Sequence, residues 1–408
     1  MSLSIKQNMF WNSLGSLTYL ICQWLVTVLV ARLSTAGYDS AGALSIAMSV
    51  SNIYASIAIY KMRAYQVSDI KGQYSQGEYV GFRLQTILLG AIVCAIYTMF
   101  TCRPEVFLTV GLYIIFRTGD VLINVYHGVD QMSYRMDICG KSMMIRGILF
   151  LVSFTVIFSS TNNLNLALLG MIASTYPILF CDIKAASNFA DVRPQFCKAT
   201  SRKLLVECFP AVLGASFFLA TTSLSRQLLG YIDGQNMLGI YASVCTPVVI
   251  IQAVADYIYT PLLGVFADSF LHKDDRRFRS YLFKVVLGIM LFGLACLAGF
   301  ALLGPIFLSI VFNQEIASYS FLLYPACICV MCTAMTTFMN ELLITLRQMK
   351  FISFANGLGL VLSVFMTLPL IKLFGMNGVS YSISISYLVS TSLMLSKTLS
   401  IIKKWKLA

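Results

Sequence analysis

Four polar side chains recur along one face of an otherwise apolar stretch, residues 108–135. They are Arg117, Asp120, Asn124 and His127, and their spacings of three, four and three residues place them on one side of a helix. Arginine grips phosphate oxygens in a bidentate fork, and aspartate can take up a proton or a cation. A charge at the centre of a membrane helix costs about 2.5–3.5 kcal/mol, so it normally faces the bundle interior or a water-filled cavity. Two interpretations stay open: Arg117 and Asp120 neutralise each other across one turn, or this face binds a polar ligand.

Polar residues also keep helical spacing in the first two apolar stretches. The first stripe is Asn8, Asn12, Ser16, Tyr19 and Gln23, and the second is Ser45, Ser49, Asn52, Ser56 and Tyr60. Small polar residues often join membrane helices to one another, so packing and cavity lining both remain possible for each stripe. Together with the face around Arg117, the stripes favour a cavity, with Asn12, Gln23 and Asn52 as candidate contacts to a substrate.

Two further charges fall in apolar stretches of the second half. Arg226 shares a helical face with Ser216 and Ser223, and it either extends to the outer membrane interface or binds a substrate. Asp256 shares a face with residues 252 and 259, and it either binds a proton or cation or pairs with a loop lysine. Asp120 and Asp256 are therefore the candidates for ion coupling.

The composition defines a polytopic membrane protein. Of 408 residues, 58% are hydrophobic and 11% are charged, and the mean hydropathy is +0.80, far from the values of a soluble domain. The net charge of +12 indicates membrane topology and not nucleic-acid binding, because the cations lie between apolar spans. The twelve cysteines fit neither a disulfide framework nor a zinc motif, so we expect buried free thiols. Residues 1–32 resemble a first span and not a removed signal peptide.

A span needs about 20 mainly apolar residues. This rule predicts all-α architecture with helices at 8–32, 38–61, 84–102, 104–127, 140–158, 164–185, 205–230, 236–263, 281–303, 318–346, 351–372 and 376–399. The apolar piece 305–312 either extends the ninth helix or forms an interfacial turn.

The cations divide unequally between alternate loops. One side receives Lys6, Lys61, Arg63, Lys71, Arg83, Arg135, Lys141, Arg146, Lys184, Arg193, Lys198, Arg202, Lys203, Lys273, Arg276, Arg277, Arg279, Lys284, Arg347, Lys350, Lys397, Lys403, Lys404 and Lys406. The other side receives Arg32, Arg103 and Lys372. This asymmetry predicts that both termini are cytoplasmic.

The two halves share a layout. Starts of the first three helices recur about 197 residues later and those of the next three about 212 later, as in transporters that bind substrate between repeats. We predict a six-helix lobe at 1–186, a basic linker at 187–204, a second lobe at 205–400 and a basic tail at 401–408.

Enzyme signatures are missing from the sequence. With two histidines, a histidine-rich metal site is excluded, and no Walker A motif is present. The outer loops are too short for a catalytic domain. We expect no enzymatic activity, no cofactor and no bound metal, so that transport depends on a gradient or on the fate of the substrate.

One long motif resembles a known family. FRTGDVLINVYHGVDQMSYRMDICGKSMMIRGI, residues 116–148, is similar to the stretch of Wzx-type polysaccharide flippases in which an arginine-containing helix leads to a Gly-x-x-Gln segment, here 128–131. Ser225-Arg226-Gln227, LGIYASV at 238–244 and residues 259–262 also look similar, although many members have a proline beside the arginine where this chain has Ser225.

The resemblance implies a fold and a substrate. The family belongs to the exporter superfamily of multidrug and toxin extrusion proteins and lipid II flippases, which have two six-helix lobes and alternating access. It implies transfer of undecaprenyl-diphosphate-linked oligosaccharide across the bacterial inner membrane for O-antigen or capsule synthesis. Arg117 and Arg226 match arginines of the family pattern and would contact the diphosphate or acidic sugars.

These observations lead to the hypothesis of a lipid-linked oligosaccharide flippase. Arg117 and Arg226 would neutralise the diphosphate in a central cavity, with Asp120 nearby; Asn12, Gln23, Asn52 and Asn124 would meet the sugars. A proton or sodium ion is a candidate counter-ion, and membrane lipids and other polysaccharide assembly proteins are candidate partners. The alternatives are a cation-coupled small-molecule or multidrug antiporter of the same fold, and a membrane polysaccharide polymerase or ligase.

Overall fold

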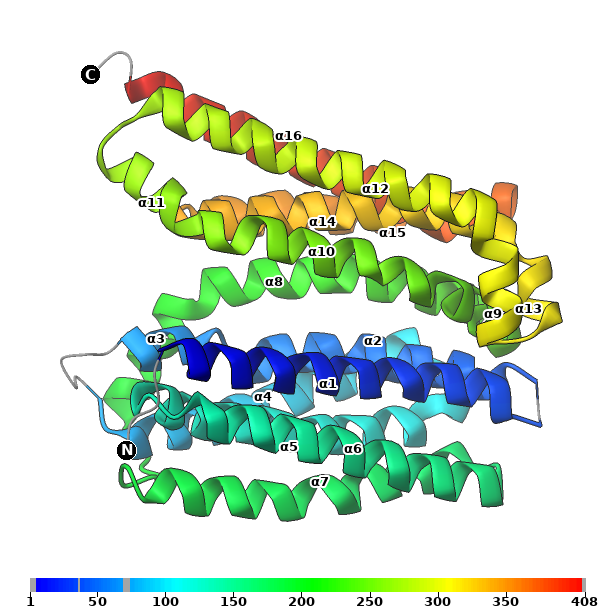
Figure 1. The fold of residues 1–408 in the computed structure, drawn as a ribbon, viewed down its shortest axis with the longest axis horizontal. Coiled ribbons are helices and arrows are strands. Elements are labelled where there is room, and N and C mark those ends of the chain that lie inside the picture. Colours follow the sequence, from blue (N-terminus) through cyan, green and yellow to red (C-terminus); the bar gives the residue numbers. More distant parts are fainter. Residues whose placement is uncertain (1–4, 36, 69–73, 406–408) are drawn as a thin grey trace. The chain divides into compact units, whose positions relative to one another are not determined.

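The computed structural model describes residues 5–35, 37–68 and 74–405 (Figure 1). Lys71 of the predicted topology set and the last three residues of the predicted basic tail lie outside this part. Within it the chain forms α-helices and short 3-10 helices and no strand. Twelve helical segments are long and apolar enough to cross a membrane, which confirms the predicted all-α membrane fold.

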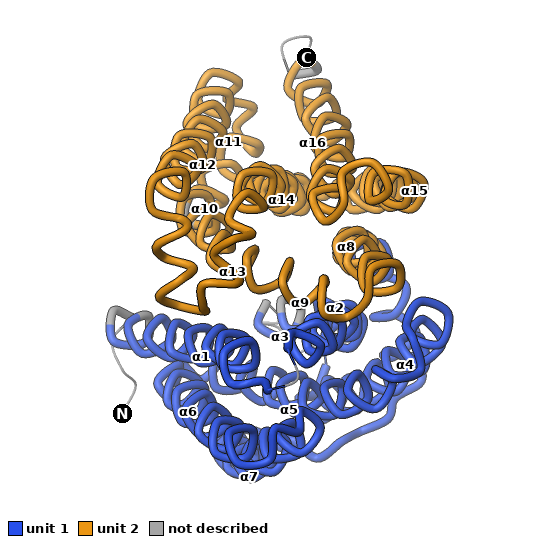
Figure 2. The backbone as a smooth tube through the Cα atoms, turned by 90° about the vertical axis from the view of Figure 1, so that its right-hand side faces the viewer, with its two compact units in different colours: residues 1–212 blue, residues 213–408 orange. Residues whose placement is uncertain are grey.

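The chain divides into two compact units, residues 1–212 and 213–408, coloured separately in Figure 2. The division falls inside one long helix, α8 (Lys198–Ile232). The predicted linker 187–204 therefore begins at the last residue of α7 (Leu164–Ser187) and ends within the first turns of α8.

The first unit is a bundle of helices around α5. Its elements are α1 (Ile5–Leu33), α2 (Asp39–Ile59), α3 (Met62–Ser68), α4 (Gln76–Thr101), η1 (Pro104–Val106), α5 (Phe107–Met132), α6 (Met136–Thr161) and α7. Helix α5 packs against α2, α4, α6 and α7, and α1 packs along α6. A helix in this position meets neighbours on several sides, so its polar residues can be distributed among several partners.

Glycines bring α1 and α6 into direct backbone contact. A Cβ atom on Gly140 would lie 2.1 Å from the carbonyl oxygen of Trp11, and one on Gly15 would lie 2.3 Å from that of Gly140. Both ends of the pair are also fastened. Asn8 bonds the backbone of residues 134 and 136, and Asn162 bonds that of residues 33 and 35.

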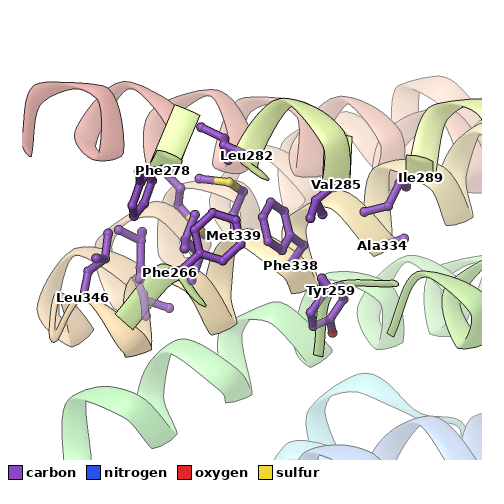
Figure 3. Close-up of a cluster of buried hydrophobic side chains, with 14 of the residues drawn as sticks. Tyr259, Phe266, Phe278, Leu282, Val285, Ile289, Ala334, Phe338, Met339 and Leu346 are labelled. Carbon is purple, nitrogen blue, oxygen red and sulfur yellow. The ribbon is translucent and has the colours of Figure 1, made fainter. Parts of the chain in front are cut away.

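The second unit contains the remaining spans. Its elements after α8 are α9 (Gly234–Cys245), η2 (Thr246–Val249), α10 (Ile250–Tyr259), η3 (Thr260–Leu262), α11 (Leu263–Leu271), α12 (Asp275–Val311), α13 (Gln314–Ser318), η4 (Ser320–Leu322), α14 (Leu323–Thr345), α15 (Met349–Phe374) and α16 (Asn377–Trp405). Helix α14 packs on α10, α12 and α16. Phe266, Phe278, Phe338 and Met339 fill a buried apolar cluster among these helices (Figure 3).

The eighth span differs from the prediction of one helix at 236–263. It is interrupted at η2, which contains Pro247, and again at η3. Proline lacks a backbone N–H and clashes with the preceding turn, so it removes an α-helical hydrogen bond and weakens the helix at this point. In the ninth span the alternative left open is decided: residues 305–311 extend α12.

Two arginines assigned to loops are in fact buried in helices. Helix α4 begins earlier than predicted because Ser75 and Glu78 form a capping box, and Arg83 consequently lies inside the helix with 0% exposure. Arg146 lies well inside α6, where it is 5% exposed. Arg83 was placed in a loop because hydropathy alone cannot distinguish a paired arginine near a helix end from a loop residue, whereas Arg146 lies in the predicted helix 140–158. The side of the membrane to which both were assigned stays a prediction.

The cysteines are free thiols as expected, but not all of them are buried. Eight of the twelve are buried, including Cys327 and Cys329 of α14, whereas Cys181 is exposed and Cys197, Cys296 and Cys332 are partly exposed.

Candidate functional site

A cluster of charges joins three helices of the first unit. Asp120 on α5 accepts a hydrogen bond from Nη1 of Arg117 on the same helix at 2.7 Å. Nη1 of Arg146 on α6 lies 3.3 Å from the other carboxylate oxygen. The hydroxyl of Tyr19 on α1 donates to Asp120 Oδ2 at 2.6 Å, and its ring lies 4.7 Å from the guanidinium of Arg146.

This cluster carries more positive than negative charge. Arg117 and Asp120 do pair across one turn, as one of the two interpretations of this face predicted. Arg146, however, adds a second cation to the same carboxylate. The side chain of Arg117 is 21% exposed, whereas that of Arg146 is 6% exposed. Arg117 is thus the member best placed to offer its remaining N–H groups to an anion.

The residues on the predicted polar face of α5 do not contact one common set of partners. Asn124, one helical turn from Asp120, accepts a hydrogen bond from Arg83 Nη2 at 3.3 Å, and Arg83 also donates to the carbonyl oxygen of Ala58 at 2.7 Å. His127 lies 3.5 Å from Asp182 on α7. The four residues predicted on one face therefore contact four different helices, α1, α4, α6 and α7.

The remaining candidates of the first unit are less enclosed. Gln23 is half-buried and donates weakly to the hydroxyl of Tyr113 at 3.4 Å. Asn12 is partly exposed, and Asn52 is exposed although α2 is otherwise mainly buried. Their roles as sugar contacts remain predictions.

Arg226 forms no ion pair with a carboxylate in the described part of the chain. It lies partly buried in α8, and none of the carboxylates in the described ranges pairs with it. Its Nε atom is buried without a hydrogen-bond partner. The hydroxyls of Tyr241 and Tyr387 and the thiol of Cys329 lie within its electrostatic range. Burial of Nε among these groups disagrees with a side chain that simply extends to the membrane interface.

Asp256, in contrast to Arg226, is a carboxylate whose hydrogen-bond partners are uncharged. Its Oδ1 accepts hydrogen bonds from Gln252 Nε2 at 3.0 Å and from the hydroxyl of Tyr259 at 2.6 Å, all on one face of α10. Among the residues placed in the structure, no lysine or arginine pairs with it, so the alternative of a loop-lysine partner finds no support. The shared face was predicted, and the mutual hydrogen bonds follow from its i, i+3 and i, i+4 spacing.

Two members of these networks, Arg83 and Arg146, were not predicted as site residues. The signal for Arg83 was the Ser75-Gln-Gly-Glu78 pattern, which starts a helix before it. Nothing local marks Arg146, because its partner Asp120 belongs to a different helix. Tyr19 was part of a predicted stripe, and its hydroxyl bonds Asp120 of α5.

Twelve apolar spans in two units, with charged residues held inside the spans, define a multi-pass membrane protein with the fold of a transporter. No family model matches the chain. The fold is shared with an inward-facing multidrug resistance MATE family transporter of the MOP superfamily, at a TM-score of 0.71 and 12% identity over 100% of this chain and 96% of that one. It is also shared with the lipid II flippase MurJ in an inward closed conformation, at a TM-score of 0.74 and 12% identity over 97% and 90% of the two chains.

One curated protein is similar in sequence. The capsular polysaccharide biosynthesis protein CapF of Staphylococcus aureus is 23% identical over 300 residues, which cover 72% of this chain and 74% of that protein. The structural likenesses show that the chain has the fold of these transporters.

Proposed function

We propose that this protein is a flippase that carries undecaprenyl-diphosphate-linked oligosaccharide repeat units across the bacterial inner membrane for O-antigen or capsule synthesis, as Wzx-type flippases do. Two similarities support the substrate class: a lipid II flippase has the same fold, and a capsular polysaccharide biosynthesis protein is similar in sequence. The resemblance of residues 116–148 to the Wzx family pattern points the same way.

The sign of the charge inside the spans carries the proposal. The cluster around Asp120 has two arginines for one carboxylate, and Arg226 has no carboxylate partner in the described part of the chain. Holding an uncompensated cation in a membrane span is costly. The cost is offset when an anionic substrate binds there, and a diphosphate matches the guanidinium fork. We assign the contacts with the anionic groups to Arg117 and Arg226.

The sugars pose a second physical problem. Each unsatisfied polar group in hydrocarbon costs several kcal/mol, and an oligosaccharide carries many. We assign their hydrogen bonds to Asn12, Gln23, Asn52 and Asn124, while Asp120 orients Arg117. The polyprenyl tail stays in lipid. Asn124 would have to share its carbonyl oxygen between Arg83 and the substrate.

Orientation and coupling belong to the same proposal. The cation asymmetry of the loops supports cytoplasmic termini, and other polysaccharide assembly proteins are candidate partners. Of the two candidate coupling groups, Asp256 is better suited than Asp120, because both carboxylate oxygens of Asp120 already contact arginines. Collapsing the proton and sodium gradients separately tests this part: transport that ignores both would exclude coupling through either carboxylate.

A second candidate function is a cation-coupled small-molecule antiporter. The MATE likeness favours it, and so does Asp256, a carboxylate without a basic partner in the described chain. It ranks below the flippase because drug cations would be repelled by the arginines. A polymerase or ligase acting on the same lipid carrier ranks lower still, since the connections between spans offer no catalytic domain.

Deleting the gene tests the proposal directly. We expect loss of surface polysaccharide together with accumulation of lipid-linked repeat units on the cytoplasmic side, both restored by the wild-type gene. Normal polymer in the deletion strain would exclude the flippase function. The assay to follow would then be gradient-driven export of small cations by the purified protein in vesicles.

A further inference from the structure

A second group of reactive side chains lies at one end of the first unit, separate from the Asp120 cluster. His127 and Asp130 are one turn apart near the end of α5, and Cys139 lies in the first turns of α6. All three are buried, with 3%, 0% and 0% exposure. Each offers a potential ligand atom, and these atoms all lie within 4.8 Å of one another.

The separations suit a small tetrahedral ion. Bonds of about 2.0–2.3 Å to nitrogen, oxygen and sulfur place neighbouring ligand atoms roughly 3.3–3.5 Å apart. Cys139 Sγ is 4.0 Å from Asp130 Oδ2, so small side-chain rotations would close the site. The helical spacing of His127 and Asp130 and the tight turn before α6 supply this geometry. No local sequence motif predicts this site, because the ligands come from two helices.

Two of the ligands have unused polar atoms. Asp130 Oδ1 and His127 Nε2 are buried and have no hydrogen-bond partner, although Asp182 Oδ2 lies 3.5 Å from the ring nitrogen. An unpaired polar atom in the interior costs free energy comparable to a lost hydrogen bond. A metal ion would give His127 Nε2 a partner, and rotation of the Asp130 carboxylate would let Oδ1 bind the ion in place of Oδ2.

The charges balance when an ion is added. Asp130, Asp182 and a Cys139 thiolate carry three negative charges, while Arg63 approaches Asp130 and Cys139 from α3. The other nearby cations have partners of their own: Arg135 pairs with Asp137 and Arg146 with Asp120. A divalent ion together with Arg63 therefore neutralises the group.

We propose that His127, Asp130 and Cys139 form a structural zinc site, with Asp182, 3.5 Å from the His127 ring nitrogen, at the fourth position of the tetrahedron. A mixed nitrogen, sulfur and oxygen set suits Zn²⁺, whereas Mg²⁺ and Ca²⁺ prefer oxygen alone. Asp182, held by a hydrogen bond of 2.6 Å from Ser142, adds negative charge from α7. The ion would join the ends of α5 and α6 beside α7, and its role would be stability and not transport chemistry.

Metal content and a cobalt spectrum of the full-length protein in detergent test this site. The protein should be purified with a histidine-free tag, stripped with a chelator and reloaded with Zn²⁺ or Co²⁺. We expect roughly one ion per chain and a thiolate-to-cobalt absorption band, as for a site with one sulfur ligand. Cys139→Ser should remove the band, and Asp130→Asn should weaken zinc binding at least about tenfold.

Two control variants separate this site from surface binding. Cys181→Ser removes an exposed thiol of α7, and His272→Ala removes the other histidine, which lies exposed beside Asp268. Both should bind the ion as the wild type does. A wild-type protein that takes up no stoichiometric ion, or a Cys139→Ser variant that keeps the cobalt band, would overturn the proposal.

A measurement on the unmodified protein covers the case in which a variant fails to fold. Zn²⁺ should raise the thermal transition of the stripped wild-type protein, and Mg²⁺ at the same concentration should not. Equal transitions with and without Zn²⁺ would also reject the site. None of these readouts depends on transport, so the zinc proposal and the flippase proposal can fail separately.

Discussion

Removing the carboxylate of Asp120 should damage the protein far more than removing the arginine beside it. At an effective dielectric constant of about 20, Coulomb's law gives roughly 6 kcal/mol of attraction for the contact at 2.7 Å and about 5 kcal/mol for that at 3.3 Å. The cost of dehydrating the charges offsets much of this. Breaking a buried pair by removing one partner nevertheless costs about 3–5 kcal/mol, because the other charge is left uncompensated.

The two substitutions leave different charges behind. Asp120→Asn leaves Arg117 and Arg146 without their shared carboxylate, so we expect a loss of about 3–5 kcal/mol in stability. Arg117→Gln leaves the Asp120–Arg146 ion pair and the Tyr19 bond intact. That variant should lose about 1–2 kcal/mol, the value of one hydrogen bond, yet it should fail to support surface polysaccharide.

Heating the detergent-solubilised variants and following the monodisperse fraction by size exclusion measures this order. Glu105→Gln removes an exposed carboxylate at η1 and should melt within about 0.5 kcal/mol of the wild type. Adding Arg146→Gln to Asp120→Asn should recover part of the loss, because it removes the more deeply buried unpaired cation. If Arg117→Gln melts as early as Asp120→Asn, Arg117 is a structural partner and the reasoning on its function is wrong.

Three further changes test other positions. At equal expression, Arg226→Ala should lower surface polysaccharide by about tenfold or more, and Arg226→Lys should lower it by less, since lysine keeps the charge but loses the planar guanidinium fork. The control Lys372→Ala, at an exposed site on α15, should have no effect. An active Arg226→Ala variant would exclude this residue from the mechanism. Gly140→Val should prevent accumulation of folded protein, because the Cβ of the new valine would lie 2.1 Å from a carbonyl oxygen of α1. The control Gly111→Ala places its Cβ in open space and should fold. Equal yields of the two variants would show that α1 and α6 can separate. Asp256→Asn should leave folding intact and make transport in vesicles indifferent to the coupling gradient, and unchanged gradient dependence would exclude it as the coupling group.

Much of the fold follows from hydropathy alone. Twelve spans were predicted because a stretch of about 20 apolar residues has few alternatives to a membrane helix. Helix ends were less predictable: α4 begins at Gln76 and α12 at Asp275, each before the apolar stretch, because capping side chains stabilise polar first turns. The break at Pro247 was overlooked because its flanks are as apolar as a continuous helix.

The site was predictable within a helix and not between helices. The spacing of Arg117 and Asp120, and that of residues 252, 256 and 259, foretold real contacts. The partners contributed by other helices, Arg146 for Asp120 and Arg83 for Asn124, depend on which helices pack together. Periodicity says which side of a helix is polar, but it does not say which neighbour that side meets.

The close contact of α1 with α6 limits how the first unit can move. Their backbones touch at Gly15 and Gly140, and asparagines secure the pair at both ends. Tilting α1 alone would break its contacts with α6, so the two helices should move together as one rigid body. The connection after α1 contains Gly37, whose φ of 70° is readily reached only by a residue without a side chain. Any tilt of α1 relative to α2 should therefore be absorbed at Gly37, while α1 and α6 stay together.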